Sequence, residues 1–157
     1  GRFFWRLDNK IIRYKVRKVR LGDLWYKGDV SQRMLQLAET YPYRYLCGDK
    51  EGYRRYCEYH KESDNPVMSE ERFDKLIESV SRNGFDERHI IIVDPFNVII
   101  DGQHRACCRA YFEGLDAEVD VLEVIGAGDY GIYGFVTPMP LWRLWRAFLR
   151  LIEPAES

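Results

Sequence analysis

The apolar positions that follow Ser69 recur with the spacing of an α-helix. Ser69 is a residue type that caps helix N-termini, and Glu70 and Glu71 suit the positive end of a helix dipole. Asn83-Gly84 supplies residue types that commonly end a helix. The sequence therefore predicts a helix over 69–83, with an apolar face made of Phe73, Leu76, Ile77 and Val80.

Short apolar runs rich in β-branched residues come next and alternate with turns. Residues 89–93 and 98–100 predict two strands joined by the Asp-Pro-Phe-Asn turn at 94–97. A helix over 103–113, closed by Gly114, and a strand over 117–124 complete the series. This order of elements predicts a compact domain of the mixed α/β (α+β) class.

The N-terminal half has a weaker pattern. Residues 10–20 predict a strand, and after a turn at Gly22-Asp23 we expect a helix over 30–39 that ends at Tyr41-Pro42-Tyr43. Residues 43–60 combine tyrosines with arginines and acids, which is typical either of an amphipathic packing face or of a pocket for a sugar-like ligand.

Composition indicates one domain with additional segments. The chain has 157 residues, of which 46% are hydrophobic and 15% aromatic, enough for a sizeable core. We expect a basic N-terminal extension over 1–40, a core over 41–136 and a C-terminal helix over 137–157. Without a membrane-spanning run or a signal peptide, and with four cysteines that lack metal-ligand spacing, we expect a cytoplasmic protein without a zinc site.

Charge is unevenly distributed, although the net charge is only −1. Residues 1–20 contain eight basic side chains and one acid, so the rest of the chain is acidic. This basic arm predicts either contact with the phosphates of DNA or of an anionic membrane, or an ordinary strand with solvated charges.

The C-terminal residues 141–152 form a tryptophan- and arginine-rich amphipathic pattern. Such a helix either lies on the inner face of a membrane, or packs on the core or on a second copy of the chain.

The residues with the clearest chemistry are Asp101-Gly102-Gln103-His104-Arg105, between a strand and a helix. A helix N-terminus leaves backbone N–H groups unpaired and favours an anion. Gly102 lets a phosphate approach the backbone, and His104 and Arg105 add side-chain donors. Asp101 is placed to cap the helix or to bind a metal or a substrate hydroxyl. The alternative is an ordinary turn, in which Asp101 caps the helix and Arg105 pairs with a carboxylate.

From Ser69 to Val124 this pattern resembles the ParB/sulfiredoxin superfamily. The turn is most similar to that of the free-serine kinase branch, which reads Asp-Gly-His-His-Arg. The resemblance implies a phosphate-binding helix N-terminus, a small mixed sheet and a bound nucleotide: ATP or ADP, with CTP as an alternative, together with Mg²⁺. It also implies nucleotide-binding roles for residues of the turn and of the preceding helix: Gly102, Gln103, His104, Arg105, Arg72, Lys75 and Ser79.

The departures from the family are also informative. Gln103 occupies the position of the reactive cysteine of sulfiredoxins, so that chemistry is not expected. The glutamate that serves the kinase branch as base has no counterpart in 64–68, which leaves the base open among Asp64, Asp49 and Glu51. Asp101 is the first candidate for a catalytic carboxylate and metal ligand, with His104 beside it.

These features predict a nucleotide-dependent phosphotransferase that acts on a small hydroxylated acceptor, such as a sugar. One alternative is a non-enzymatic, DNA-associated nucleotide switch like ParB. Another is a membrane-docked adaptor without nucleotide.

Overall fold

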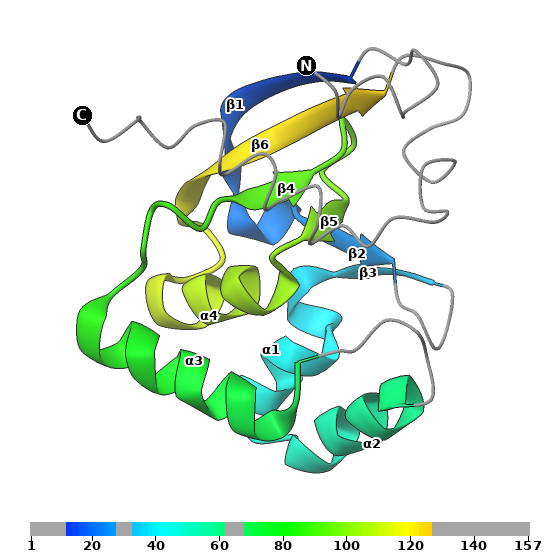
Figure 1. The fold of residues 1–157 in the computed structure, drawn as a ribbon, viewed down its shortest axis with the longest axis vertical. Helices are drawn as coiled ribbons and strands as arrows, with labels where there is room; N and C mark the ends of the chain where they lie inside the picture. The colour runs from blue at the N-terminus through cyan, green and yellow to red at the C-terminus, as the bar shows by residue number, and fades with distance from the viewer. Residues whose placement is uncertain (1–11, 28–32, 62–67, 127–157) are drawn as a thin grey trace, which may run out of the picture. The chain divides into compact units, whose positions relative to one another are not determined.

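The computed structural model describes residues 12–27, 33–61 and 68–126 (Figure 1). Tyr14–Ile125 forms one compact unit. The predicted C-terminal helix and residues 1–11 of the basic arm lie outside the described residues, and so does Asp64. No helix in the three described stretches is long and apolar enough to cross a membrane.

A four-stranded sheet forms one side of the unit. It consists of β1 (Ile12–Arg20), β4 (Ile91–Val93), β5 (Ile99–Asp101) and β6 (Glu118–Gly126), in the order β1-β6-β4-β5. β4 is antiparallel to β5 and parallel to β6, and helix α4 makes the connection that a parallel pair requires. The expected class, a mixed α/β domain with a small mixed sheet, is therefore confirmed.

A short ribbon replaces the helix that we expected at 30–39. β2 (Trp25–Lys27) pairs antiparallel with β3 (Met34–Gln36), and the 3-10 helices η2 (Leu21–Asp23) and η3 (Leu37–Glu39) flank the ribbon. The helix prediction was wrong for the described part of this stretch, because its burial alternates with period two. Leu35 is half-buried and Leu37 is buried, whereas Met34 and Gln36 are exposed.

Two helices occupy the aromatic segment. Tyr41-Pro42-Tyr43 begins α1 (Tyr41–Leu46) instead of ending a helix, and α2 (Lys50–Lys61) follows it. A proline is tolerated in the first turn of a helix because the N–H that it lacks has no partner there. The proline was therefore a correct boundary signal, but we assigned it to the wrong end.

The later elements follow the sequence closely. α3 spans Glu70–Asn83, and Ser69 caps it by accepting a hydrogen bond from the Arg72 N–H. Buried Asp94 organises the turn between β4 and β5 by accepting from the N–H groups of Phe96 and Val98. α4 (Gln103–Glu113) begins and ends where predicted.

Helix α4 lies between the sheet and the helices α1 and α3 (Figure 1), and it contributes to two buried clusters. The first, which we call the sheet cluster, joins β4 and β6 to Ala106, Cys107 and Ala110 of α4. The second, which we call the aromatic cluster, joins α1, α2 and α3 to Cys108. Cys107 and Cys108 point to different sides of the helix, and burial raises the pKa of each thiol to about 12. Both thiols are therefore packing residues at neutral pH.

Candidate anion-binding turn and the adjoining cavity

The backbone at Gly102 has a conformation that favours glycine. Its φ is +93°, in the left-handed region, and it stands at the N-cap of α4 without a side-chain capping bond. A Cβ at this position would lie 3.3 Å from the Cα of Ile91 and 3.1 Å from Nη2 of Arg105. The glycine therefore lets strand β4 and the guanidinium approach a helix start whose N-cap residue makes no side-chain capping bond.

Arg105 lies directly against this glycine. Its Nη2 donates to Oδ2 of Asp101 over 3.1 Å, which is the carboxylate pairing that the sequence left as an alternative. Its Nε is buried and has no acceptor among the described residues. A buried, unsatisfied guanidinium N–H is costly, so an acceptor that reached it after a small shift of the side chain would stabilise the turn.

Asp101 offers one partly exposed carboxylate, with 42% of its side chain accessible. Within the described stretches, no three His, Cys, Asp or Glu side chains are grouped to hold a metal ion. Mg²⁺ commonly binds one or two carboxylates together with the phosphates of a substrate. Asp101 fits that limited role, with the phosphates as the other ligands.

The His104 side chain points away from the turn and into the aromatic cluster. Its Nε2 lies 2.8 Å from the Tyr53 hydroxyl, and the rings of Tyr53 and Phe73 meet it edge-on. Burial, reinforced by the charge of Arg105, lowers the pKa of His104 to about 3. The expectation of a cationic His104 donor beside Arg105 is therefore corrected: the ring is neutral and packs, so that only its backbone remains at the turn.

The remaining turn and α3 candidates are only partly brought together. Gln103 is buried, and Ser79 and Arg105 line a common cavity. Arg72 and Lys75 are exposed, and Nζ of Lys75 pairs with Glu71 over 2.7 Å.

Asp49 and Glu51 are engaged at the start of α2. Asp49 accepts from the Gly52 N–H over 3.0 Å and pairs with Arg44, and Glu51 pairs with Arg55. None of the ion pairs or hydrogen bonds of these two acids in the described structure reaches Asp101. Their role as base therefore stays a prediction without geometric support.

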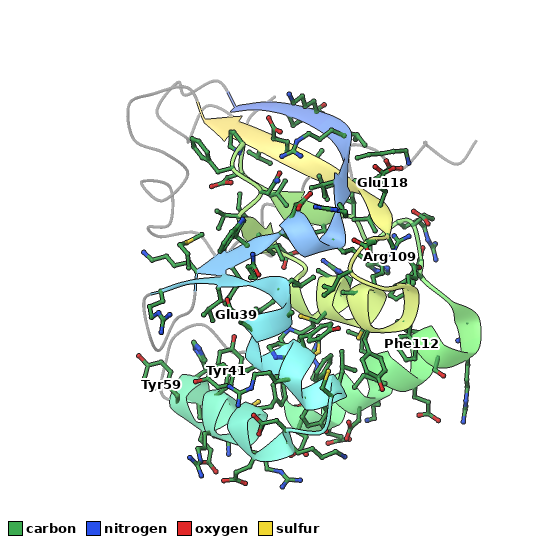
Figure 2. The ribbon with its side chains drawn as sticks, turned by 180° about the vertical axis from the view of Figure 1, so that it is seen from behind. Glu39, Tyr41, Tyr59, Arg109, Phe112 and Glu118 are labelled. Carbon is green, nitrogen blue, oxygen red and sulfur yellow. The ribbon has the colours of Figure 1, made fainter. Side chains whose placement is uncertain are left out.

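The tyrosine-rich segment packs and does not form an open pocket. Tyr45, Tyr53 and Tyr56 are buried. Tyr45 and Tyr53 pack at tilted angles against Phe73 and against each other, and Tyr56 packs in the same way against Tyr53. Tyr59, near the end of α2, is exposed (Figure 2). Of the two interpretations of residues 43–60, the structure shows the packing face. A sugar-like acceptor therefore has no preformed place among these buried rings.

A cavity of about 420 Å³ lies instead beside the C-terminal half of α3. Two arginines of α4, Arg105 and Arg109, line it together with carboxylates from Asp86, Glu87 and Asp120. Its apolar lining comes from β1, from α3 and from the segment that leads into β4. These residues are Val16, Leu76, Val80, Phe85, Ile90 and Ile91. Its volume is within the usual range for small-molecule sites.

Arg109 is the residue of this cavity that the sequence reasoning missed. It lies one turn after Arg105, so i, i+4 spacing along the predicted helix would have placed both on one face. Its guanidinium lies 5.0 Å from the centre of the Phe85 ring, and Nε lies 3.3 Å from Glu113. Arg109 is labelled on α4 in Figure 2.

The described part of the basic arm is paired within the fold. Lys15 and Arg17 both contact the buried Glu123, Lys18 pairs with Asp120, and Arg20 pairs with Asp23 and Asp116. Over Tyr14–Arg20 the structure therefore agrees with the interpretation of an ordinary strand with solvated charges.

Comparisons with protein-family models, with curated proteins and with solved structures gave no match.

Proposed function

We propose that this domain binds a nucleotide through its phosphates at the Asp101–Arg105 turn and transfers the terminal phosphoryl group to a small hydroxylated acceptor. The observation that carries the proposal is the conjunction at Gly102. An uncapped helix start, a left-handed glycine and a buried guanidinium N–H without an acceptor all meet at this residue. Each of the three favours an anion.

The charges at the turn support binding of a phosphate group. Arg105 has five N–H donors, and its hydrogen bond to Asp101 leaves other donors for a phosphate oxygen. The dipole of the 11-residue helix α4 adds positive potential at the same place. Because the ring of His104 is neutral and points away, the backbone of α4 and Arg105 carry this role.

In the proposed reaction, the P–O bond between the terminal phosphorus and the bridging oxygen of ATP or ADP breaks. A new P–O bond forms to the hydroxyl oxygen of the acceptor, and the hydroxyl proton passes to a carboxylate. Asp101 remains our first candidate for that carboxylate, because it is partly exposed and joined to Arg105. Mg²⁺ would neutralise charge on the phosphates when bound.

A thermal-shift series with ATP, ADP, CTP and GTP, each with and without Mg²⁺, tests the binding step. At a ligand concentration 100 times Kd, binding stabilises a fold by about 2.7 kcal/mol, which is a shift of several degrees for a domain of this size. We expect the adenine nucleotides to give the largest shift. A preference for CTP would instead favour the ParB-like switch.

The matched variants are Arg105→Lys and Arg82→Lys. Both keep the charge and lose the fork of the guanidinium, but Arg82 lies on the exposed side of α3 and pairs with Glu78. Each variant is compared with its own ligand-free Tm. A shift that is reduced in Arg105→Lys and retained in Arg82→Lys supports the proposal, whereas equal shifts in both, or no shift with any nucleotide, would overturn it.

A further inference from the structure

The charges around the cavity follow an order from inside to rim. Arg109 and Arg105 are its least exposed charged groups, with 19% and 24% of their side chains accessible. The carboxylates are more open, with 37% for Asp86, 48% for Asp120 and 75% for Glu87. A ligand would therefore meet cations inside the cavity and hydrogen-bond acceptors at its rim.

Arg105 and Arg109 project from one face of α4, and their ion pairs engage only part of their N–H donors. They lie one turn apart on α4, where side chains i and i+4 are neighbours. Phe85 lies beneath the Arg109 guanidinium, and this contact limits where the side chain can move. Arg105 pairs back along the helix with Asp101, and Arg109 pairs with Glu113 and Glu87. Both arginines line the cavity, and their remaining N–H donors suit a carboxylate or a phosphate, because both anions accept paired hydrogen bonds.

The rim is suited to hydroxyl groups. Bonds and charge from Arg88 lower the pKa of Asp86 to about 2, so this carboxylate stays ionised and only accepts hydrogen bonds near neutral pH. Ser79 adds a hydroxyl from α3. The apolar side chains of Leu76, Val80 and Ile91 offer a surface for the C–H face of a ring.

We infer that this cavity binds a small anionic sugar, with its carboxylate or phosphate group between Arg105 and Arg109 and its hydroxyls toward Ser79 and Asp86. That this sugar is the acceptor in phosphoryl transfer rests on the proposed function, whereas its binding does not. The cavity reaches the turn through Arg105, so a ligand held there would lie beside a phosphate at Gly102. A nucleobase fits this charge order less well, because it carries no anionic group for the inner arginines.

Isothermal titration of the whole chain with four probes tests this inference. Glucuronate and glucose 6-phosphate carry the two kinds of anionic group, glucose carries neither, and ATP reports on the turn. We expect both anionic sugars to bind and glucose to bind at least about tenfold more weakly, because glucose lacks the charged group that would accept hydrogen bonds from the arginines. If only one of the two anionic sugars binds, that result shows whether the cavity selects a carboxylate or a phosphate group.

Two variants with controls locate the site. Ser79→Phe places a ring at the cavity, and Ser81→Phe places the same ring on an exposed position of α3 that does not line it. Arg109→Gln removes an inner cation, and Arg82→Gln removes an exposed one. Loss of sugar binding in Ser79→Phe and Arg109→Gln, but not in the controls, supports the inference.

Three other outcomes would overturn it. The first is ATP binding that Ser79→Phe and Arg109→Gln leave unchanged, without binding of any sugar, which leaves the proposed function intact. The second is sugar binding that survives Ser79→Phe and Arg109→Gln. The third is ATP binding that both variants abolish while sugars fail to bind, which would make the cavity a nucleobase site. If ATP fails to bind and the anionic sugars bind as expected, the proposed function fails and the cavity assignment stands.

Discussion

His104 and Arg105 are neighbours in the chain, yet their side chains enter opposite kinds of environment. His104 enters the aromatic cluster, where its ring is neutral and packed against Tyr53 and Phe73. Arg105 lines a cavity whose walls carry five other charged or titratable residues. Successive residues on a helix point about 100° apart, so one turn of α4 can serve stability on one side and binding on the other.

This difference shows that each residue of a sequence motif has to be assigned its role separately. A histidine and an arginine at a helix start looked like two donors to one anion. The structure brings only the arginine to the cavity. If this comparison is sound, changes on the aromatic side should alter the stability of the fold, and changes on the cavity side should alter binding with little effect on stability.

The largest expected effect is that of Phe73→Ala, on the aromatic side. Phe73 is fully buried and contacts Tyr45, Tyr53 and His104. Removing a buried phenyl ring costs roughly 3–5 kcal/mol, which urea unfolding monitored by circular dichroism would measure. Phe96→Ala, at an 81% exposed position in the β4–β5 turn, is the control and should change stability by less than about 0.5 kcal/mol. Equal effects of the two substitutions would contradict the assigned core.

The second effect is a loss of stability in acid that depends on His104. Its folded pKa of about 3 lies below the value near 6.5 in an unfolded chain, so between these values the unfolded state binds the proton. The stabilisation from the neutral ring is therefore present above about pH 6.5 and is lost as the pH falls toward 3. One such group contributes a slope of at most about 1.4 kcal/mol per pH unit.

Chemical denaturation at several pH values between 4 and 7.5 would measure this slope. His104→Phe keeps a ring in the cluster and should flatten the slope in that window. His89→Phe, at a half-exposed histidine in the same unit, is the matched control and should leave most of it. An unchanged slope in His104→Phe would show that the ring is not neutral and enclosed as described.

The smallest expected effect is that of Gly102→Ala, at the boundary between the two sides. A non-glycine residue in the left-handed region costs roughly 1–2 kcal/mol, and here the Cβ would also crowd Ile91 and Arg105. Gly48→Ala also places an alanine at positive φ, but its Cβ would meet nothing within 4 Å. A loss of stability in both variants, with nucleotide shifts reduced only in Gly102→Ala, would support a role of the close approach at Gly102 in binding.

The regular parts of the fold could be predicted because their signals are local. Ser69, Gly84 and Gly114 mark helix ends through their own backbone or side-chain preferences, and α4 spans the range expected for it, roughly 103–113. The ribbon at β2 and β3 could not be predicted in the same way. It depends on pairing Trp25 with Gln36 and on a bridge from Trp25 to Val98, which are contacts between distant parts of the chain.

Only the part of the candidate site that the local backbone forms could be predicted from the sequence. Gly102 and the start of α4 follow from the strand-to-helix turn. The direction of the His104 ring depends on Tyr53, 51 residues earlier, and the cavity depends on β1 and β6 meeting α3. No pattern within the motif contains that information, although the spacing of Arg105 and Arg109 contains part of it.

The position of α4 between the two clusters also has a consequence for how the unit opens. Cys107 is buried in one cluster and Cys108 in the other, so neither cluster can separate from the helix without exposing a neighbour of the same turn. The amide protons of α4 should therefore exchange with solvent only in openings that disrupt both clusters, and so should be among the slowest in the unit. An anion bound at the start of this helix would then slow hydrogen exchange on both sides at once.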